Sequence, residues 1–343
     1  MKIAFYDTKP YDEKTFKPYI DKYNLDFKFF ESKLNIDTVN LTSGYDGVCV
    51  FVNDDLNKEV IDKLYKLGVK AIFLRCAGFN NVDTNACFGK IHVYRVPAYS
   101  PYAVAEHAIA MFLTNNRRIH KAYNRTREYN FSLNGLTGRD LHGMTVGVIG
   151  TGKIGKIFIN ICKGFGMNIL AYDKYPSDET IKYVSLEKLF KNSDVISLHC
   201  PLTEETKNII NEETIKLMKK GVNIINTSRG ELIDARALLN GIKERKIGSA
   251  CLDVYEEESD IFFEDKSGHI MDDSNLRELL SMPNVIVTSH QAFLTKEALN
   301  NIADITTSNI LNFFNGNGNK DNEVCYYCGK EQNCSKNREN KCF

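Results

Sequence analysis

The sequence predicts an α/β protein of two domains, each built on a parallel β-sheet covered by helices. Short apolar runs alternate with amphipathic stretches along the chain, which is the pattern of strands joined by helices. A G-x-G-x-x-G segment directly after one of these runs is typical of a doubly wound sheet that binds a dinucleotide. The length of 343 residues exceeds what one ordinary hydrophobic core encloses and favours two domains.

The first hundred residues contain four apolar runs of strand length and one clear helix. The runs are KIAFYD, DGVCVFV, VKAIFLR and IHVYRVP. The stretch NKEVIDKLYKLG, residues 57–68, predicts an amphipathic helix that ends at a glycine. Residues 97–123 follow with helical spacing and are long enough to connect two domains. The residues that recur at this spacing are Ala103, His107, Ala110, Met111 and Thr114.

A second alternating series begins at residue 145 and predicts six more strands in a doubly wound sheet. Its runs are TVGVIG, NILAYD, DVISLHCP, VNIINTS, GSACLDVY and NVIVTSH. The closing stretch, residues 294–316, predicts a helix with no strand after it. Its expected place is back on the first domain, which would make that domain discontinuous.

Composition excludes several classes of protein. Lysine plus arginine equals aspartate plus glutamate, at 44 each, so no global field favours nucleic acid or an anionic membrane. The start of the chain has no long apolar region of a signal peptide, and no uncharged run approaches the ~18 residues of a membrane span. Six scattered cysteines are interpreted as small core residues with free thiols. Free thiols suit a reducing compartment, so we expect a cytoplasmic protein.

The glycine motif consists of Gly150, Gly152 and Gly155, between a strand and a helix. The first glycine permits the tight turn, the second lets a pyrophosphate approach the backbone, and the third lets helix pack on strand. Asp173 follows 18 residues after Gly155, at the end of the next strand, where an acid binds ribose hydroxyls and repels a 2′-phosphate. NAD is therefore the expected cofactor, with Lys174 as a reservation; an ordinary glycine-rich turn is the alternative.

Ligands of such sheets bind beyond the carboxyl ends of the strands, so the residues there are candidates for a site. Arg229, the acidic run from Asp253 to Glu258, and His290 each follow a predicted strand. Reduction of a 2-oxo acid needs these groups: a cation for the carboxylate, a proton donor for the carbonyl oxygen, and an acid that keeps the donor charged. Singly, the histidine is more often a satisfied surface or core residue and the acidic run a solvated turn. Their common position at strand ends favours a site.

These residues belong to long blocks that resemble the D-2-hydroxyacid dehydrogenases, and among them the bacterial fermentative NAD-dependent D-lactate dehydrogenases. The blocks include LRCAGFNNVD, VPAYSPYAVAEHAIAM, GVIGTGKIG, NTSRGELID, DVYEEE and HQAFLT, and they span residues 1 to about 320. The resemblance implies a flavodoxin-like catalytic domain of residues 1–100 and 293–320. It implies an inserted NAD-binding domain of residues 101–292, with 321–343 left as a cysteine-rich tail.

The resemblance also implies roles for individual residues. Arg229 would grip the substrate, His290 would donate the proton, and Glu258 would pair with His290. The substrate would further contact Phe51, Ala77, Gly78, Tyr99 and Phe293, with the N–H groups of Ala77 and Gly78 on its carboxylate. The expected cofactor ligands are Gly150, Gly152, Lys153, Ile154, Gly155, Asp173, Cys200, Pro201, Thr206, Thr227, Ser228, Arg229 and Asp253, the last near the nicotinamide amide.

The activity implied is reversible NADH-dependent reduction of pyruvate to D-lactate by a cytoplasmic homo-oligomer, a dimer or tetramer, with a cleft that closes over the substrate. A broader enzyme for branched or aromatic 2-oxo acids is the alternative. An NADH-sensing binding module is a third reading, and the intact arginine, glutamate and histidine argue against it. Neither nucleic acid nor a membrane is expected as a partner.

The tail departs from the family pattern. Cys325, Cys328, Cys334 and Cys342 form C-x2-C-x5-C-x7-C. Four thiolates could hold zinc tetrahedrally, but the second pair lacks the usual spacing, and a disordered tail with redox-active thiols is the alternative. No metal ligand is therefore assigned.

Overall fold

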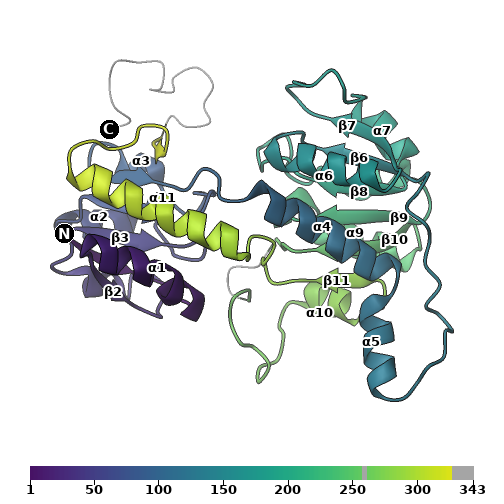
Figure 1. Cartoon of the computed structure of the whole chain (residues 1–343), viewed down its shortest axis with the longest axis horizontal. Coiled ribbons are helices and arrows are strands. Elements are labelled where there is room, and N and C mark those ends of the chain that lie inside the picture. Colours follow the sequence, from purple (N-terminus) through teal and green to yellow (C-terminus); the bar gives the residue numbers. More distant parts are fainter. Residues whose placement is uncertain (257–260, 327–343) are drawn as a thin grey trace. The chain divides into compact units, whose positions relative to one another are not determined.

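The computed structural model describes residues 1–256 and 261–326. The chain forms two compact units, one of Met1–Ser100 and Thr295–Phe343 and the other of Pro101–Leu294 (Figure 1). Both are α/β units with a six-stranded sheet, so the predicted fold class is confirmed. None of the helices in the described ranges is both long and apolar enough to cross a bilayer.

The sheet of the first unit has the order β12-β5-β4-β3-β1-β2, in which β1 to β5 run parallel and follow the flavodoxin-like order. Its strands are β1 (Lys2–Phe5), β2 (Asp26–Phe29), β3 (Gly47–Val50), β4 (Ala71–Leu74), β5 (His92–Tyr94) and β12 (Glu323–Val324). The strand β2 is not among those that the sequence predicts. This edge strand buries none of its side chains fully, and so it lacks a continuous apolar run.

Helices of the first unit include a pair, α1 and α11, that pack against each other although they come from opposite ends of the chain (Figure 1). The helical segments are α1 (Pro10–Tyr23), the 3-10 turn η1 (Val39–Thr42), α2 (Lys58–Lys66), α3 (Thr84–Cys87) and α11 (Lys296–Phe314). The prediction that the last long helix returns to the first unit is confirmed.

The second unit has the parallel order β11-β10-β9-β8-β6-β7, and all six predicted runs form its strands. These are β6 (Thr145–Ile149), β7 (Asn168–Tyr172), β8 (Val195–Leu198), β9 (Val222–Asn226), β10 (Ile247–Leu252) and β11 (Val285–Val287). Because β7 and β8 lie on opposite sides of β6, the order reverses at the end of β6. Such a reversal is where ligands of doubly wound sheets bind.

Helices of the second unit cover both faces of the sheet, and each face has its own core. They are α4 (Pro101–Asn116), α5 (Ile119–Arg127), α6 (Lys153–Gly164), α7 (Leu186–Asn192), α8 (Glu212–Leu217), the 3-10 turn η2 (Gly230–Leu232), α9 (Ala235–Lys243) and α10 (Ser274–Ser281). Successive residues of β9 point to opposite faces, so Ile224 packs with α7 to α10 and Ile225 with α4 and α6. This two-sided burial explains why the strands read as continuous apolar runs.

The expectation of no strand after the last helix was wrong, because β12 pairs antiparallel with β5. The His92 Nδ1 and Glu323 Oε1 atoms lie 2.6 Å apart, and the Arg95 N–H donates to the Asn322 carbonyl oxygen at 2.9 Å. Cys325 is buried just after the strand, whereas Cys328, Cys334 and Cys342 lie outside the described residues. A two-residue strand carries too few side chains to show a pattern in sequence.

Two truncations are expected to behave differently because of this strand. Deleting residues 327–343 should leave the melting temperature close to that of the parent. Deleting residues 322–343 also removes Glu323, Val324 and the Asn322 carbonyl, and should lower the melting temperature by on the order of 5 °C. Differential scanning fluorimetry of the three proteins measures this, and equal melting temperatures for both truncations would show that β12 contributes nothing to the sheet.

Candidate active site

The turn between β6 and α6 has the backbone that the glycine motif predicts. Gly150 has a φ of +94°, and a Cβ built there would lie 2.5 Å from the Cys200 nitrogen. A Cβ at Gly155 would lie 2.1 Å from the Gly150 carbonyl oxygen, so side chains are excluded at both positions. A Cβ at Gly152 meets nothing within 4 Å in the described structure. This open space at the start of α6 is where a phosphate group can reach backbone N–H groups.

Asp173 lies at the end of β7 and is bound to the glycine turn. Its Oδ2 accepts hydrogen bonds from the Thr151 N–H at 2.6 Å and from the Thr151 hydroxyl at 2.9 Å. Lys174 was the one residue that argued against a strict preference for NAD over NADP. Its Nζ lies 2.9 Å from the Glu205 carboxylate in an exposed ion pair. The predicted ribose acid is therefore held against the turn, and the neighbouring lysine is engaged by a carboxylate.

The ends of β8 and β9 bring several predicted cofactor residues together. The Ser228 hydroxyl donates to the Cys200 carbonyl oxygen at 2.7 Å, and the Thr206 hydroxyl donates to the Pro201 carbonyl oxygen at 2.7 Å. The Thr227 hydroxyl oxygen is buried and has no hydrogen-bond partner in the part of the chain that the structure describes. A buried hydroxyl without a protein partner fits a site whose partner is a ligand.

His199 supports the glycine turn and is not among the site residues that the sequence predicts. Its Nε2 lies 2.9 Å from the Ser197 hydroxyl oxygen, and its ring packs against Phe158 with 4.8 Å between centroids. Burial lowers the pKa of His199 to about 3, so the ring is neutral under the glycine turn. The sequence could have indicated this residue, because His199 directly follows the end of β8, where ligand sites of such sheets lie.

Arg229 follows β9 and is half-buried. Its Nη1 donates to the Ser228 carbonyl oxygen at 2.7 Å, and no carboxylate pairs with it among residues 1–256 and 261–326. The glycine behind it is required by close packing, because a Cβ at Gly230 would lie 2.0 Å from the Tyr255 carbonyl carbon. A half-buried guanidinium without a described carboxylate partner is suited to an anionic ligand.

Asp253 and His290 follow β10 and β11, which are the next strands beyond β9 in the sheet. Asp253 is fully buried, and its Oδ2 accepts from the Ala292 N–H at 2.9 Å while its carbonyl oxygen accepts from the His290 N–H at 2.7 Å. His290 has a φ of +48°, a conformation that is uncommon outside glycine and often marks functional sites. Its ring centroid lies 5.9 Å from that of Phe263.

The predicted substrate residues of the first unit lie in the segments that follow β3, β4 and β5. Ala77 and Gly78 follow β4, and the N–H of neither donates a hydrogen bond within the described residues. Arg95 Nη1 donates to the Ala77 carbonyl oxygen at 2.8 Å, which holds this loop. Adjacent unbound N–H groups can accept a carboxylate. The Tyr99 carbonyl oxygen accepts from the Asn301 side-chain amide at 2.6 Å.

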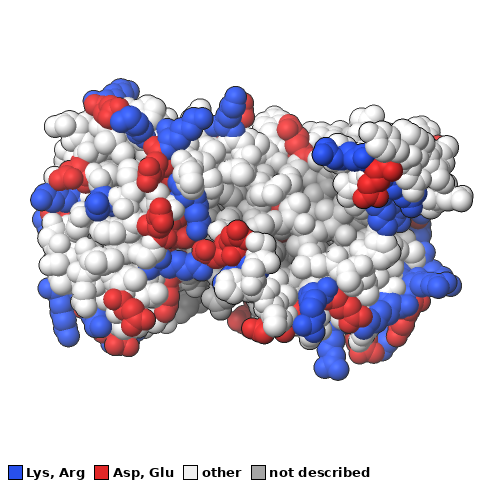
Figure 2. Space-filling view, turned by 90° about the horizontal axis from the view of Figure 1, so that it is seen from below, with Lys and Arg blue, Asp and Glu red and all other residues white. Residues whose placement is uncertain are grey.

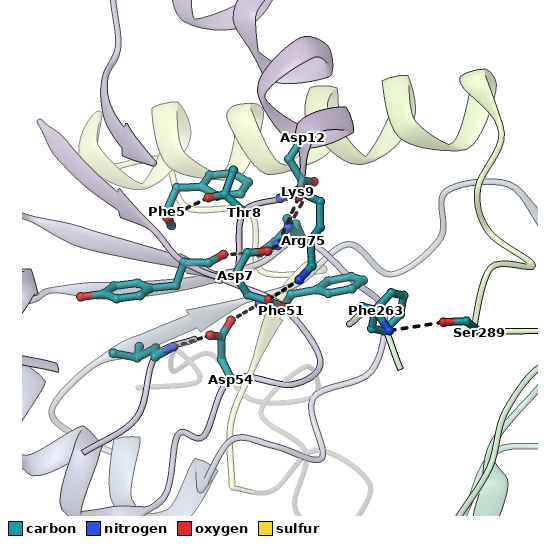
Figure 3. Close-up of polar contacts among 12 residues, drawn as sticks. Phe5, Asp7, Thr8, Lys9, Asp12, Phe51, Asp54, Arg75, Phe263 and Ser289 are labelled. Carbon is teal, nitrogen blue, oxygen red and sulfur yellow. Dashed lines mark hydrogen bonds and ion pairs between the residues drawn. The ribbon is translucent and has the colours of Figure 1, made fainter. Parts of the chain in front are cut away.

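A buried arginine, Arg75, follows β4 and contacts Phe51 after β3 (Figure 3). Its guanidinium is sandwiched between the rings of Phe5 and Phe51, each with its centroid 4.6 Å from Cζ. It donates to the carbonyl oxygen of Asp7 at 2.6 Å and lies 3.3 Å from the Asp12 carboxylate. Burial raises the pKa of Asp12 above its usual value, and the Arg75 charge opposes that rise.

The predicted residues thus divide between the units. Phe51, Ala77, Gly78 and Tyr99 belong to the first, whereas Arg229, His290 and the buried Phe293 belong to the second. Glu258, predicted to pair with His290, lies outside the described residues. Within the second unit, Arg229, Asp253 and His290 follow three adjacent strands of the sheet, β9, β10 and β11.

Free space at a helix start next to an acid that can bind ribose is the mark of a dinucleotide-dependent oxidoreductase. An arginine available to an anion, at the same edge of the sheet as a histidine in a left-handed backbone, narrows this class to enzymes that act on small organic acids. Comparison with known proteins places the chain within the class. A sequence model described as the NAD-binding domain of D-isomer specific 2-hydroxyacid dehydrogenases matches residues 109–292.

Similar proteins cover almost the whole chain. A 2-hydroxyacid dehydrogenase homolog of Haemophilus influenzae is 55% identical over 92% of this chain and 97% of its own length. D-lactate dehydrogenase of Escherichia coli is 52% identical over 92% of this chain and 98% of its own. The chain belongs to the D-isomer specific 2-hydroxyacid dehydrogenases, and it is an NAD-dependent oxidoreductase.

Solved structures of this family have the same fold as this chain. The apo-structure of the E. coli D-lactate dehydrogenase matches with a TM-score of 0.86 and 49% identity, over 94% of this chain and all of that chain (100%). The NAD-complexed D-isomer specific 2-hydroxyacid dehydrogenase of Lactobacillus delbrueckii ssp. bulgaricus matches with a TM-score of 0.79 and 31% identity, over 94% and 100%. The fold and the cofactor therefore agree with the sequence-based predictions.

Proposed function

We propose that this enzyme is a D-lactate dehydrogenase that interconverts pyruvate and D-lactate. The observation that carries the proposal is Arg229, a half-buried guanidinium after β9, in the sheet that carries the glycine motif, with no carboxylate partner in the described chain. The E. coli relative that bears this name, at 52% identity, supports the choice of substrate. The match of the NAD-binding family to residues 109–292 supports residues 101–292 as the cofactor domain and residues 1–100 and 293–320 as the catalytic domain.

NADH, when bound, supplies the hydride that reduces the carbonyl carbon. The residues of this chain bind and orient the acid. Arg229 grips the carboxylate with its planar fork of donors and polarises the carbonyl, and the N–H groups of Ala77 and Gly78 bind the carboxylate as well. His290 donates a proton to the carbonyl oxygen, and in the reverse direction it accepts the proton of the lactate hydroxyl. Glu258 is the proposed acid that keeps His290 charged.

The activity test is NADH oxidation with a panel of 2-oxo acids. We expect the highest kcat/KM with pyruvate, and lower values with 2-oxoisocaproate, phenylpyruvate and oxaloacetate. Chiral analysis should find D-lactate as the product. A higher kcat/KM for a branched or aromatic acid would assign the enzyme to the broader D-2-hydroxyacid class. NADH binding without turnover of any of these acids would favour a sensing module.

The cofactor preference is a second expected result. NADH should exceed NADPH in kcat/KM by about 100-fold, because the Asp173 carboxylate would repel a 2′-phosphate. Asp173→Asn keeps an oxygen that can accept from Thr151 but removes the charge, so it should narrow the ratio. Lys174→Ala is the neighbouring control and should leave NADH the preferred cofactor. Equal efficiencies for both cofactors in the parent would remove Asp173 from this role.

The enzyme is further proposed to be a homo-oligomer that associates through α5. This helix, labelled in Figure 1, fully buries none of its side chains within the described structure. Ile119 and Tyr123, one turn apart in its sequence, are 51% and 59% exposed. Tyr129, Phe131 and Leu133 follow α5 in the chain and are at least 71% exposed. Exposed apolar area of this kind is typical of an interface between copies.

Disruption of this surface should change the assembly. Tyr123→Lys is expected to shift the enzyme to a smaller species, because a charge in an apolar interface remains unpaired. Tyr175→Lys is the matched control, since Tyr175 is similarly exposed in another part of the unit. Sedimentation velocity at several concentrations measures the mass. A parent that sediments as a monomer would contradict the proposal.

We also propose a cytoplasmic location and no nucleic-acid partner. The seven described cysteines are all buried free thiols, which suits a reducing compartment. On the face in Figure 2, lysine and arginine side chains are intermixed with aspartate and glutamate, without a patch of one sign. This distribution supports a small-molecule enzyme rather than a binder of polyanions.

A further inference from the structure

The loop that carries His290 is held by one carboxylate, that of Asp253. Asp253 Oδ1 accepts from the Gln291 N–H at 2.9 Å, and Oδ2 accepts from the Ala292 N–H at 2.9 Å. The Thr288 hydroxyl donates to Oδ1 at 2.5 Å. Hydrogen bonds thus flank His290 on both sides, and its own N–H donates to the Asp253 carbonyl oxygen. The left-handed backbone of His290 is therefore imposed by contacts with Asp253.

A second histidine, His107 of α4, completes this arrangement. Its Nε2 lies 3.1 Å from the Thr288 hydroxyl oxygen and 3.4 Å from Asp253 Oδ1. The His107 side chain is 19% exposed and the Asp253 side chain 0%, so the contacts are largely shielded from water. The activity proposed above leaves His107 without a role.

The direction of the hydrogen bonds follows from the donors that are present. A carboxylate accepts only, so the short contact between Thr288 and Asp253 takes the single hydroxyl proton of Thr288. The Thr288 oxygen must then accept, and His107 must donate from Nε2. His107 thus fixes the rotamer in which the Thr288 hydroxyl points at Asp253. Replacing its N–H by an apolar group frees that hydroxyl to rotate.

The place of these residues along the chain adds a second argument. α4 begins at Pro101, the first residue of the second unit, and the loop after Thr288 runs to Leu294, its last residue. His107 therefore connects the segment where the chain enters this unit to the segment where it leaves. Met111, one turn further along α4, also contacts the Thr288 hydroxyl through its sulfur, at 3.6 Å.

We propose that His107 is a positioning residue for His290, acting through Thr288 and the Asp253 carboxylate. The inference rests on the proposed function, in which His290 is the proton donor. By donating to Thr288, His107 keeps Asp253 in the arrangement that sets the backbone of residues 290–292. Loss of the donor would displace the imidazole of His290 from the carbonyl oxygen that it must protonate.

Kinetics of His107 variants test this role. His107→Leu should lower kcat for pyruvate reduction about 10- to 100-fold, because a displacement of about 1 Å is enough to cost that much. The KM for NADH should change less than kcat, since the glycine turn between β6 and α6 is untouched and Asp253 is only one of the expected cofactor residues. His107→Gln, which retains an N–H donor, should recover most of the lost kcat. Leu113→Met is the matched control on the same helix, since Leu113 packs against the core of the unit, and it should resemble the parent.

A double-mutant cycle separates positioning from general packing. Thr288→Val keeps the shape of threonine and removes the hydroxyl, whereas Thr288→Ser keeps the hydroxyl. If both residues act through one hydrogen bond, His107→Leu with Thr288→Val should be no slower than the slower single variant. Additive losses, or a parent-like kcat in His107→Leu, would overturn the inference. If His107→Leu fails to fold, Thr288→Val compared with Thr288→Ser decides in the same way.

One more variant separates this inference from the proposed function. His290→Gln should abolish most pyruvate reduction if His290 is the proton donor. A parent-like rate in His290→Gln would refute that role and the inference together. A large loss in His290→Gln alongside a parent-like rate in His107→Leu would refute the inference alone.

Discussion

Arg229→Lys is expected to lower kcat/KM for pyruvate about 1,000-fold, the upper end of what loss of one charge-stabilising donor costs an enzyme. A guanidinium is planar and can donate hydrogen bonds to both carboxylate oxygens at once. The lysine ammonium is a compact charge on a shorter side chain and cannot reproduce this bidentate contact. The Arg229 head group is also oriented by the Ser228 carbonyl oxygen, at 2.7 Å from Nη1. A lysine can satisfy that carbonyl or the substrate, but it cannot hold both in the same geometry.

The loss should appear in both KM and kcat, because Arg229 binds the carboxylate in the ground state and polarises the carbonyl during reduction. Steady-state kinetics with pyruvate measures the two constants. Arg236→Lys is the matched control: Arg236 is an exposed arginine on α9, and its variant should behave as the parent. An Arg229→Lys enzyme within a few-fold of the parent would mean that the substrate carboxylate is held elsewhere.

Arg75→Met is expected to destabilise the protein by about 3–5 kcal/mol, the usual cost of removing one partner from a buried ion pair. Arg75 is 1% exposed, so the pair with Asp12 is not screened by water. Methionine fills much of the space between Phe5 and Phe51 but leaves the Asp12 carboxylate buried without its counter-charge. The carbonyl oxygens of Tyr6 and Asp7 also lose their donors.

Urea unfolding followed by circular dichroism measures this effect. Lys58→Met is the control, because Lys58 pairs with Asp62 at the surface and its loss should leave the unfolding midpoint unchanged. Arg75→Met combined with Asp12→Leu should recover part of the stability, since apolar replacement of both partners removes the unpaired charge. An Arg75→Met protein as stable as Lys58→Met would contradict the assigned role of the buried arginine.

Local patterns located most of the strands and the dinucleotide turn because their causes are local. β6 to β11 are buried on both faces of the sheet, so their sequences are nearly continuous apolar runs. Such runs can be recognised in one sequence alone. Gly150 and Gly155 are required by contacts within a few residues or one strand away. β2 and β12 are short edge strands and are not predicted, because they lack such runs. β12 forms only by pairing with β5, more than two hundred residues earlier in the chain.

The sequence by itself determined which chemical groups stand at the strand ends: an arginine, an aspartate and a histidine after β9, β10 and β11. Only the tertiary structure decided how those groups are supported. Gly230 is required by the backbone of Tyr255, and His107 meets Thr288 across a separation of 181 residues. The spacing of apolar residues along a chain shows the periodicity of a single helix or strand. A hydrogen bond between distant residues depends on the packing of whole elements, so it becomes visible only when the elements are in place.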